Sequence, residues 1–356
     1  MSRGLPLQAS LTSSFTHESD LLDAERILKH QSLLGTLEIT VIDADLQHSL
    51  FKKVKLPVLR TLKLEYLRLH MGIPASHFYE TWEMPELRYL ETNFVPLRAL
   101  GKAIVSFKLD ISDLSCDLFF GLDRTLEFLA SCPLLENLDV RFDDISEYIT
   151  PETGVAVIMR NLRTLTLQAA SPDYFSWLAR FLERLVIDNV TDLSLGLNKL
   201  RRSWNDVEVM AKRMTMYQET EMWGPVIVSR IAKIPRLREM KLYIEEGRAG
   251  KEGTKEPSKD EYIWAFISVI RELPPTLERF VSISPLHHIH MCRKHVHIDG
   301  GRTHLDIVHG KTLTLEQLLF FMDWAKAKSG TIILRDSPLI PEAVLRSAIP
   351  NWVKVE

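Results

Sequence analysis

The sequence predicts an α/β solenoid of the leucine-rich-repeat type, with parallel strands on its concave face and an α/β cap at the C-terminal end. Three observations support this prediction. A short pattern, apolar at positions 1, 4 and 6, recurs along the chain; a proline precedes several copies by two residues; and segments with helical spacing of apolar residues lie between copies. The 356 residues are therefore expected to form one elongated array.

The pattern is plainest in "KLPVLRTLKLEYL" (55–67), "EMPELRYLETNFV" (83–95), "ASCPLLENLDVRF" (130–142) and "KIPRLREMKLYIE" (233–245). Positions 4 and 6 alternate as in a half-buried strand. Proline fixes φ and cannot donate a hydrogen bond, so it suits the turn that leads into the strand. Most early copies are spaced near the period of a leucine-rich repeat. The copies are Leu34-Leu37-Ile39, Leu59-Leu62-Leu64, Leu87-Leu90, Ile104-Phe107-Leu109, Leu135-Leu138-Val140, Leu162-Leu165-Leu167, Leu182-Leu185-Ile187, Leu237-Met240-Leu242 and Leu277-Phe280.

Helices are expected between the strands at 20–30, 117–132, 173–184 and 257–273, where apolar residues recur three and four apart. The resulting order predicts an array over 20–285, with a poorly ordered tail at 1–19. Within the array, a helical insertion is expected at about 203–233 and a flexible loop at 247–259. Residues 286–356 should form the cap, with helices at 312–328 and 341–349 and a strand at 331–335.

Composition excludes several classes of protein. A net charge of −3 gives no reason to expect nucleic acid or an anionic membrane as a partner. No apolar run approaches the ~18 residues that a membrane span needs, and the N-terminal segment lacks the apolar stretch of a secretory signal. Three widely spaced cysteines argue for a reducing compartment. We expect a cytoplasmic or nuclear protein without cofactors.

The segments "CPLLENLDVRF", "MPELRYLE", "LPVLRTLKL" and "MRNLRTLTL" resemble the irregular leucine-rich repeats that follow the F-box in fungal F-box-like proteins, over roughly 20–285. The resemblance implies the substrate-recognition part of a ubiquitin ligase receptor, with cullin-type ligase components as further partners. The F-box itself is not recognisable, since "GLPLQASLTSSF" has Leu5-Pro6 but no helical continuation. The alternative is a non-catalytic scaffold or degenerate paralogue without a ligase link. Position 9, usually Asn or Cys in such repeats, is here Leu67, Val95, Asp143, Ala170, Val190 and Glu245, so irregular turns are expected.

A protein or peptide ligand is expected on the concave face, where positions 3, 5 and 7 of each strand point outward. The surface is varied and nearly balanced in charge, which suits a protein better than a polyanion. The predicted binding residues are Thr61, Lys63, Glu65, Tyr89, Glu91, Asn93, Lys108, Asp110, Asn137, Asp139, Arg141, Arg184, Asp188, Glu239, Lys241 and Tyr243.

No catalytic arrangement is found, and the protein is predicted not to be an enzyme. The strongest chemical signal is the histidine-rich segment "HHIHMCRKHVHIDGG" (287–301). In a strand, His288 with His290, or His295 with His297, would share one face and could hold zinc if a third ligand approached. The favoured interpretation is a pair of polar edge strands that close the array. Zinc binding is the less favoured alternative.

Overall fold

The structure is a computed structural model. In this structure the chain forms two compact units. Unit 1 comprises Met1–Leu167 with Arg180–Asn189, and unit 2 comprises Gln168–Ala179 with Val190–Glu356. The structure describes residues 6–13, 18–41, 54–66, 79, 81–96, 98–111, 122–142, 156–169, 175–198, 226–227, 229–245, 276–277, 279–283, 288–294, 302–308, 331–334 and 353–355.

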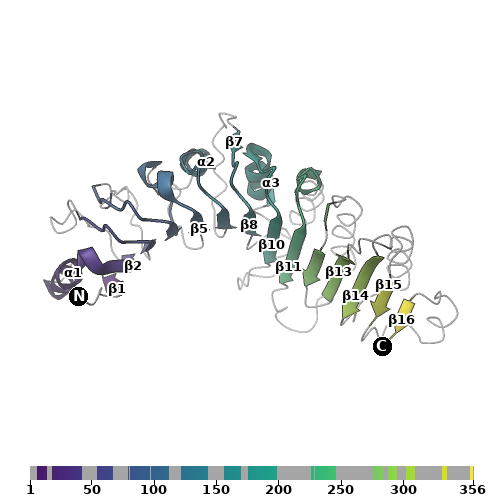
Figure 1. The fold of residues 1–356 in the computed structure, drawn as a ribbon, viewed down its shortest axis with the longest axis horizontal. Helices are drawn as coiled ribbons and strands as arrows, with labels where there is room; N and C mark the ends of the chain where they lie inside the picture. The colour runs from purple at the N-terminus through teal and green to yellow at the C-terminus, as the bar shows by residue number, and fades with distance from the viewer. Residues whose placement is uncertain are drawn as a thin grey trace, which may run out of the picture. The chain divides into compact units, whose positions relative to one another are not determined.

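Unit 1 contains a sheet whose strands follow one another in chain order (Figure 1). Every pair of neighbours from β1 to β6 is parallel. This arrangement confirms the predicted repeat-like α/β solenoid with parallel strands. The strands are β1 (Leu7–Ser13), β2 (Leu34–Val41), β3 (Thr61–Tyr66), β4 (Tyr89–Thr92), β5 (Ser106–Ile111), β6 (Asn137–Phe142) and β8 (Thr164–Ala169), whose last two residues fall to unit 2.

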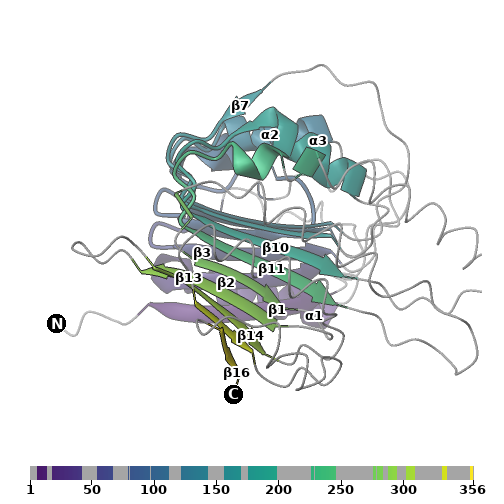
Figure 2. The ribbon, with the colours of Figure 1, turned by 90° about the vertical axis from the view of Figure 1, so that its right-hand side faces the viewer.

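Helical segments connect the strands and cover one side of the sheet. They are α1 (Glu18–Leu28), η1 (Gln31–Leu33), η3 (Arg98–Ala103), α2 (Leu122–Ala130) and α3 (Phe175–Arg184). Figure 2 shows α2 in a layer above the strands. Two aromatic pairs join strand and helix: Phe107 and Phe128 have ring centroids 4.8 Å apart, and Phe142 and Phe181 lie 5.7 Å apart. The strands' other side carries no described helix.

The buried core includes the predicted ladder positions. Leu62, Leu90, Phe107, Leu138 and Leu165, all at position 4, are no more than 1% exposed. Successive strands place Leu62, Leu90, Phe107 and Leu138 opposite one another, because the parallel register aligns equivalent repeat positions. Each repeat therefore buries its apolar residues against the repeats before and after it.

The recurrent proline has a defined place in the structure. In each proline-containing copy, the position 1 N–H donates to the carbonyl of the residue three before it, which closes a four-residue turn. The proline is the second residue of that turn, where its fixed φ is favourable and no N–H is needed. The bonds are Leu59 to Leu56 (3.2 Å), Leu87 to Met84 (3.2 Å), Leu135 to Cys132 (3.2 Å) and Leu237 to Ile234 (3.4 Å).

The first strands of unit 2 pair in parallel, and antiparallel pairs follow them. β10 to β11 and β11 to β12 pair in parallel, whereas β12 to β13 and β13 to β14 are antiparallel. The change falls where the cap was predicted to begin, and β15 forms at the predicted 331–335 strand. The strands are β10 (Asp192–Asn198), β11 (Glu239–Glu245), β12 (Arg279–Ile283), β13 (His288–Lys294), β14 (Arg302–Val308), β15 (Thr331–Leu334) and β16 (Val353–Val355).

Two predictions about strands are wrong. The histidine-rich strand β13 and its neighbour β14 are not edge strands, because β12 pairs with β13 and β15 with β14. The segment Leu7–Ser13, expected in a poorly ordered tail, is strand β1 in register with β2. Its sequence LQASLTS has only weak apolar alternation, so its strand conformation depends on pairing with β2.

The predicted repeat at Leu182-Leu185-Ile187 is also wrong. Leu182 lies in α3, Leu185 begins β9 (Leu185–Val186), and Ile187 follows that strand. Among the described residues, β9 pairs with β7 (Val157–Ile158) in a separate two-stranded sheet. The strand of this repeat is β10, where Leu193 and Leu195 follow Val190 with the 1-4-6 spacing.

Several predictions lie outside the described residues: the loop 247–259, the helices 257–273, 312–328 and 341–349, and residues 203–225 of the expected insertion. Within 226–233, the described residues include helical turns with buried Ile227 and Ile231. In the part of the chain that the structure describes, no helix is long and apolar enough to cross a membrane.

Candidate functional site

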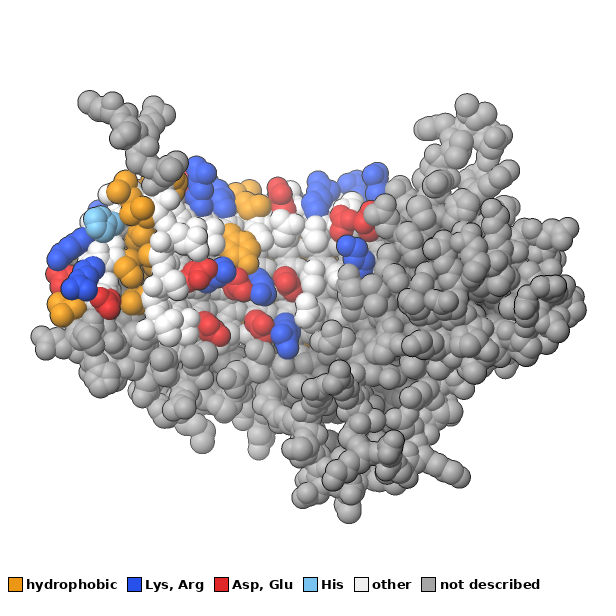
Figure 3. Space-filling model, turned by 90° about the horizontal axis from the view of Figure 1, so that it is seen from below, with side chains coloured by type: hydrophobic (Ala, Val, Ile, Leu, Met, Phe, Trp, Pro, Cys, Tyr) orange, Lys and Arg blue, Asp and Glu red, His pale blue; other side chains and the backbone are white. Residues whose placement is uncertain are grey.

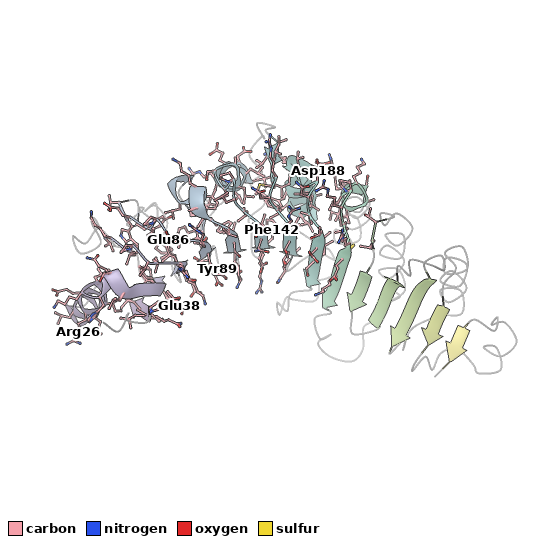
Figure 4. The ribbon with its side chains drawn as sticks, in the orientation of Figure 1. Arg26, Glu38, Glu86, Tyr89, Phe142 and Asp188 are labelled. Atoms are coloured by element: carbon pink, nitrogen blue, oxygen red, sulfur yellow. The ribbon has the colours of Figure 1, made fainter. Side chains whose placement is uncertain are left out.

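The helix-free face of strands β2 to β6 carries the side chains at positions 3, 5 and 7, and we call these side chains the ladder face. Figure 4 shows Glu38 and Tyr89 pointing away from the helices, and Figure 3 shows acidic and basic side chains interspersed on this side. The ladder face comprises Thr36, Glu38, Thr40, Thr61, Lys63, Glu65, Tyr89, Glu91, Ser106, Lys108, Asp110, Asn137, Asp139 and Arg141.

The middle row of the ladder face alternates in charge. Register places Glu38, Lys63, Glu91, Lys108 and Asp139 opposite one another on five consecutive strands. Lys63 Nζ lies 2.9 Å from Glu38 Oε1 and 3.8 Å from Glu91 Oε2. Lys108 Nζ lies 2.6 Å from Glu91 Oε1. Opposite charges on directly opposed residues stabilise neighbouring strands, so the row supports the sheet as well as forming its surface.

Glu91 is the centre of this row. Burial alone would raise the pKa of its carboxyl, but hydrogen bonds from Lys108 and Tyr89 outweigh burial and hold the pKa below its usual value. The same interaction raises the pKa of Lys108. A hydrogen bond to Glu38 raises the pKa of Lys63. Glu91 and its two lysine partners are therefore charged at neutral pH.

Replacing Glu91 with glutamine is expected to lower the free energy of unfolding by ~1–2 kcal/mol near neutral pH, since two lysines lose a charged partner. A carboxyl whose pKa is lowered by folding stabilises the protein above its unfolded pKa, and this contribution disappears as pH falls through the folded pKa. Urea unfolding at about pH 7 and about pH 3 should therefore show the variant's deficit shrinking in acid. An equal deficit at both pH values would contradict the role of the Glu91 charge.

The pKa of Asp139, at the end of the row, is raised, whereas that of Glu91 is lowered. Burial raises the pKa of its carboxyl, Lys108 opposes that shift, and the neighbouring Asp110 and Glu91 add to it. Asp110 in turn lies 3.8 Å from Arg141, from Oδ2 to Nη1. Asp139→Asn is thus a suitable control for Glu91→Gln, because removing a disfavoured charge should not destabilise the fold.

A neutral row runs beside the charged one. Thr36, Thr61, Tyr89, Ser106 and Asn137 are opposite one another in register and offer hydroxyl and amide groups. The Tyr89 hydroxyl donates to Glu91 Oε2 at 3.0 Å, and burial together with this bond raises the pKa of Tyr89 to about 12. The tyrosine is therefore fixed against the charged row and remains neutral in physiological conditions.

The charges of the ladder face sum to a small negative value. Its five acidic residues outnumber its three basic ones, and each base has an acidic partner within 4 Å. Such a surface lacks the unpaired cations that bind phosphate groups. Its mixture of polar rows and one aromatic ring suits contacts with another protein.

Asn93 was predicted to lie exposed on the ladder face, but it is buried. It follows the end of β4 and is 9% exposed. Its side chain accepts from the Tyr66 N–H at 2.9 Å and donates to the Tyr66 carbonyl at 2.8 Å, so it continues the hydrogen-bonding of β4 with β3. Asn93 is therefore a structural residue: at position 7 of its repeat, it bonds to the backbone of the preceding repeat through its side chain.

Arg184 and Asp188 were also predicted on the face, and both predictions are wrong. Arg184 ends α3, is 7% exposed and pairs with Asp123 of α2 at 2.5 Å. Asp188 is exposed close to α3 and away from the strand face (Figure 4). Both errors arise from the incorrect repeat at Leu182, because its 1-4-6 pattern spans a helix end and β9.

The repeat that begins at Val190 supplies the strand residues expected here. Its positions 3, 5 and 7 are Asp192, Ser194 and Gly196 of β10. An asparagine directly before position 1 could have identified Val190, not Leu182, as the start of this repeat. Asn189 donates to the Arg160 carbonyl at 2.6 Å, as Asn161 donates to the Pro133 carbonyl at 2.7 Å. Each of these asparagines directly precedes position 1 of its repeat.

The remaining predicted residues lie in unit 2. Glu239, Lys241 and Tyr243 occupy alternate positions of β11, as expected, with Lys241 exposed. His288 and His290 lie two residues apart in β13, whereas 295–301, with the other two predicted histidines, is outside the described residues. Among the side chains that the structure describes, no three His, Cys, Asp or Glu come together to hold a metal ion.

The sequence matches no protein-family model and no curated protein.

Proposed function

We propose that this protein is a protein-binding module and that the ladder face recognises a protein or peptide. The observation that carries the proposal is the helix-free sheet face, on which aligned rows of polar residues are held in fixed positions by cross-strand ion pairs. A row of preorganised side chains loses little conformational entropy on binding. Partly exposed Tyr89 supplies an aromatic contact of the kind enriched at binding hot spots.

Within this proposal, we favour the substrate-recognition role of an F-box-type ubiquitin ligase receptor, with cullin-type ligase components as further partners. The support is the resemblance of the repeat segments, together with the parallel repeat-like fold. A second candidate is a scaffold that binds its partner without a ligase. This scaffold would use the same ladder face, and the strand Leu7–Ser13 lengthens the sheet that carries it.

The proposal is tested by affinity purification of the full chain with quantitative mass spectrometry. The face variant combines Tyr89→Ala, Glu65→Lys and Asn137→Lys, which leaves the charged row intact and alters residues that are not buried. The control variant combines Glu86→Lys with Asp188→Asn, which changes the net charge equally but lies outside the strands of the face (Figure 4).

We expect the face variant to recover its main partner at least about ten-fold less than the wild type, and the control to recover it unchanged, because loss of a hot spot costs ~2 kcal/mol or more. Recovery of cullin ligase components would favour the receptor, and a reproducible partner without them would favour the scaffold. If the face variant kept every partner, the ladder face would not be the binding surface.

A further inference from the structure

The charges of the ladder face do not pair completely. Each of its three bases has an acidic partner within 4 Å, and these partners are Glu38, Glu91 and Asp110. The other two acids, Glu65 and Asp139, have no basic side chain within that distance among the residues that the structure describes. The negative charge of the face therefore belongs to two particular positions.

Asp139 is half-buried, and little around it compensates its charge. Its opposite residue on β5 is Lys108, whose Nζ lies 2.6 Å from Glu91 Oε1 and is thus already engaged. On its other side, β8 carries the uncharged Thr166 at the same repeat position. Burial is the main reason why the pKa of the Asp139 carboxyl is raised. A further cation beside this carboxyl would stabilise its charged form.

Asp110 adds to the deficit around Asp139. Its Oδ2 lies 3.8 Å from Arg141 Nη1, which is longer than a hydrogen bond, and its buried Oδ1 accepts no hydrogen bond from the described residues. Asp110 and Asp139 are diagonal neighbours on β5 and β6, and their repulsion contributes to the raised pKa of Asp139. A cation bound at Asp139 would also reduce this repulsion.

Glu65 is the second acid without a basic partner, and it lies three strands away from Asp139. Its side chain is exposed and accepts a hydrogen bond from the Thr40 hydroxyl at 3.4 Å. Three strand spacings of ~4.8 Å and an offset of two residues along the strands separate the two acids by roughly 16 Å. An extended chain covers this distance with about five residues, so one segment can reach both acids.

We propose that the ladder face binds an extended basic segment of another protein, whose lysine or arginine side chains contact Asp139 and Glu65. This inference rests on the proposed function, because it names the kind of partner that the same face takes. Charge complementarity favours this occupant. An acidic segment would meet two carboxylates without counter-ions, and bases that already have acidic partners.

The two contacts should differ in strength. Water and salt screen an ion pair at exposed Glu65 more than one at half-buried Asp139. Asp139 is therefore expected to contribute more to affinity, and Glu65 is expected to orient the segment across the strands.

The first test uses a phage-displayed library of random peptides of about twelve residues, long enough to span both acids, selected on the immobilised full chain. Selected peptides should carry at least about two more lysines or arginines than the starting library and bind Tyr89→Ala more weakly. Peptides that bind through the face without this enrichment would overturn the basic partner and leave the protein-binding function intact. Selection of no face-dependent peptide would also overturn this inference, whereas the affinity purification described above tests the face separately.

Fluorescence anisotropy of the tightest selected peptide then measures each contact. Asp139→Asn should weaken binding at least about ten-fold, and Glu65→Gln by at most about five-fold. Glu86→Gln is the matched control, since it removes one negative charge in the turn before β4 and should leave the affinity unchanged. Equal losses in Asp139→Asn and Glu86→Gln would show that only the overall charge matters, which contradicts the assigned contact.

A double-mutant cycle keeps the test decisive if Asp139→Asn also perturbs the fold. Each base of the peptide is replaced by glutamine in turn, and each peptide is titrated against the wild type and Asp139→Asn. For one base, the substituted peptide should bind both proteins equally, because the contact with Asp139 is already lost. If every substituted peptide still bound Asp139→Asn more weakly by the full factor, Asp139 would not contact a base of the partner.

Discussion

Replacing Leu138 with aspartate is expected to unfold unit 1. Leu138 is 1% exposed and lies opposite Phe107, in the row of position 4 residues that continues through the sheet. A carboxylate there would lose its hydration without gaining a partner, at a cost of ~4 kcal/mol or more. Because a domain of this size has ~5–15 kcal/mol of stability in total, the variant should be largely unfolded or strongly destabilised.

Urea unfolding followed by circular dichroism, together with limited proteolysis, measures this effect. Leu138→Ala gives a graded comparison, with an expected loss of ~2–5 kcal/mol from the cavity alone. Asn137→Asp is the matched control, since it introduces the same carboxylate at the adjacent exposed residue. A Leu138→Asp protein with the unfolding midpoint of the wild type would show that the position 4 row is not the core.

Replacing Asn93 with alanine is expected to destabilise unit 1 by ~2–4 kcal/mol, because two buried hydrogen bonds to the Tyr66 backbone are lost together. The side chain occupies the place where a further residue of β4 would pair with β3. The neighbouring residues depend on this arrangement: Phe94 packs edge-on against Tyr66, with ring centroids 4.9 Å apart, and its carbonyl accepts from the Thr92 hydroxyl at 2.7 Å.

Urea unfolding measures the loss, and hydrogen exchange locates it. The Tyr66 amide should exchange faster in Asn93→Ala than in the wild type, whereas amides in β6 should be affected only through global unfolding. Asn137→Ala is the control, because this asparagine is exposed on the ladder face. Unchanged exchange at Tyr66 in Asn93→Ala would mean that the two hydrogen bonds do not hold the end of β4.

The sequence alone was sufficient to predict the repeat. Apolar residues at positions 1, 4 and 6 predicted the strands and the buried residues of β3, β5 and β6, and the proline before β3 and β6 predicted their turns, because each of these features is decided within a few residues. The pleat alternates side chains with a period of two wherever a strand forms, and proline restricts φ whatever lies around it. Lys63, Glu91, Lys108 and Asp139 were placed on the helix-free face for the same reason.

Properties that depend on a neighbouring strand could not be predicted in this way. Leu182-Leu185-Ile187 and Val190-Leu193-Leu195 both satisfy the spacing, and only the second has β11 beside it. The strand β1 has a weak pattern of its own and forms through pairing with β2.

The same distinction applies to individual side chains. Asn93 acts as a backbone substitute because β4 ends at Thr92 while β3 continues to Tyr66. Likewise, the opposition of positions 290 and 306, and of 292 and 304, follows only from the register of two antiparallel strands. Local patterns therefore determined which residues are buried and where the chain turns, whereas the tertiary structure decided which residues meet. The physical reason is that register is fixed by pairing and packing between distant segments, and no local preference specifies it.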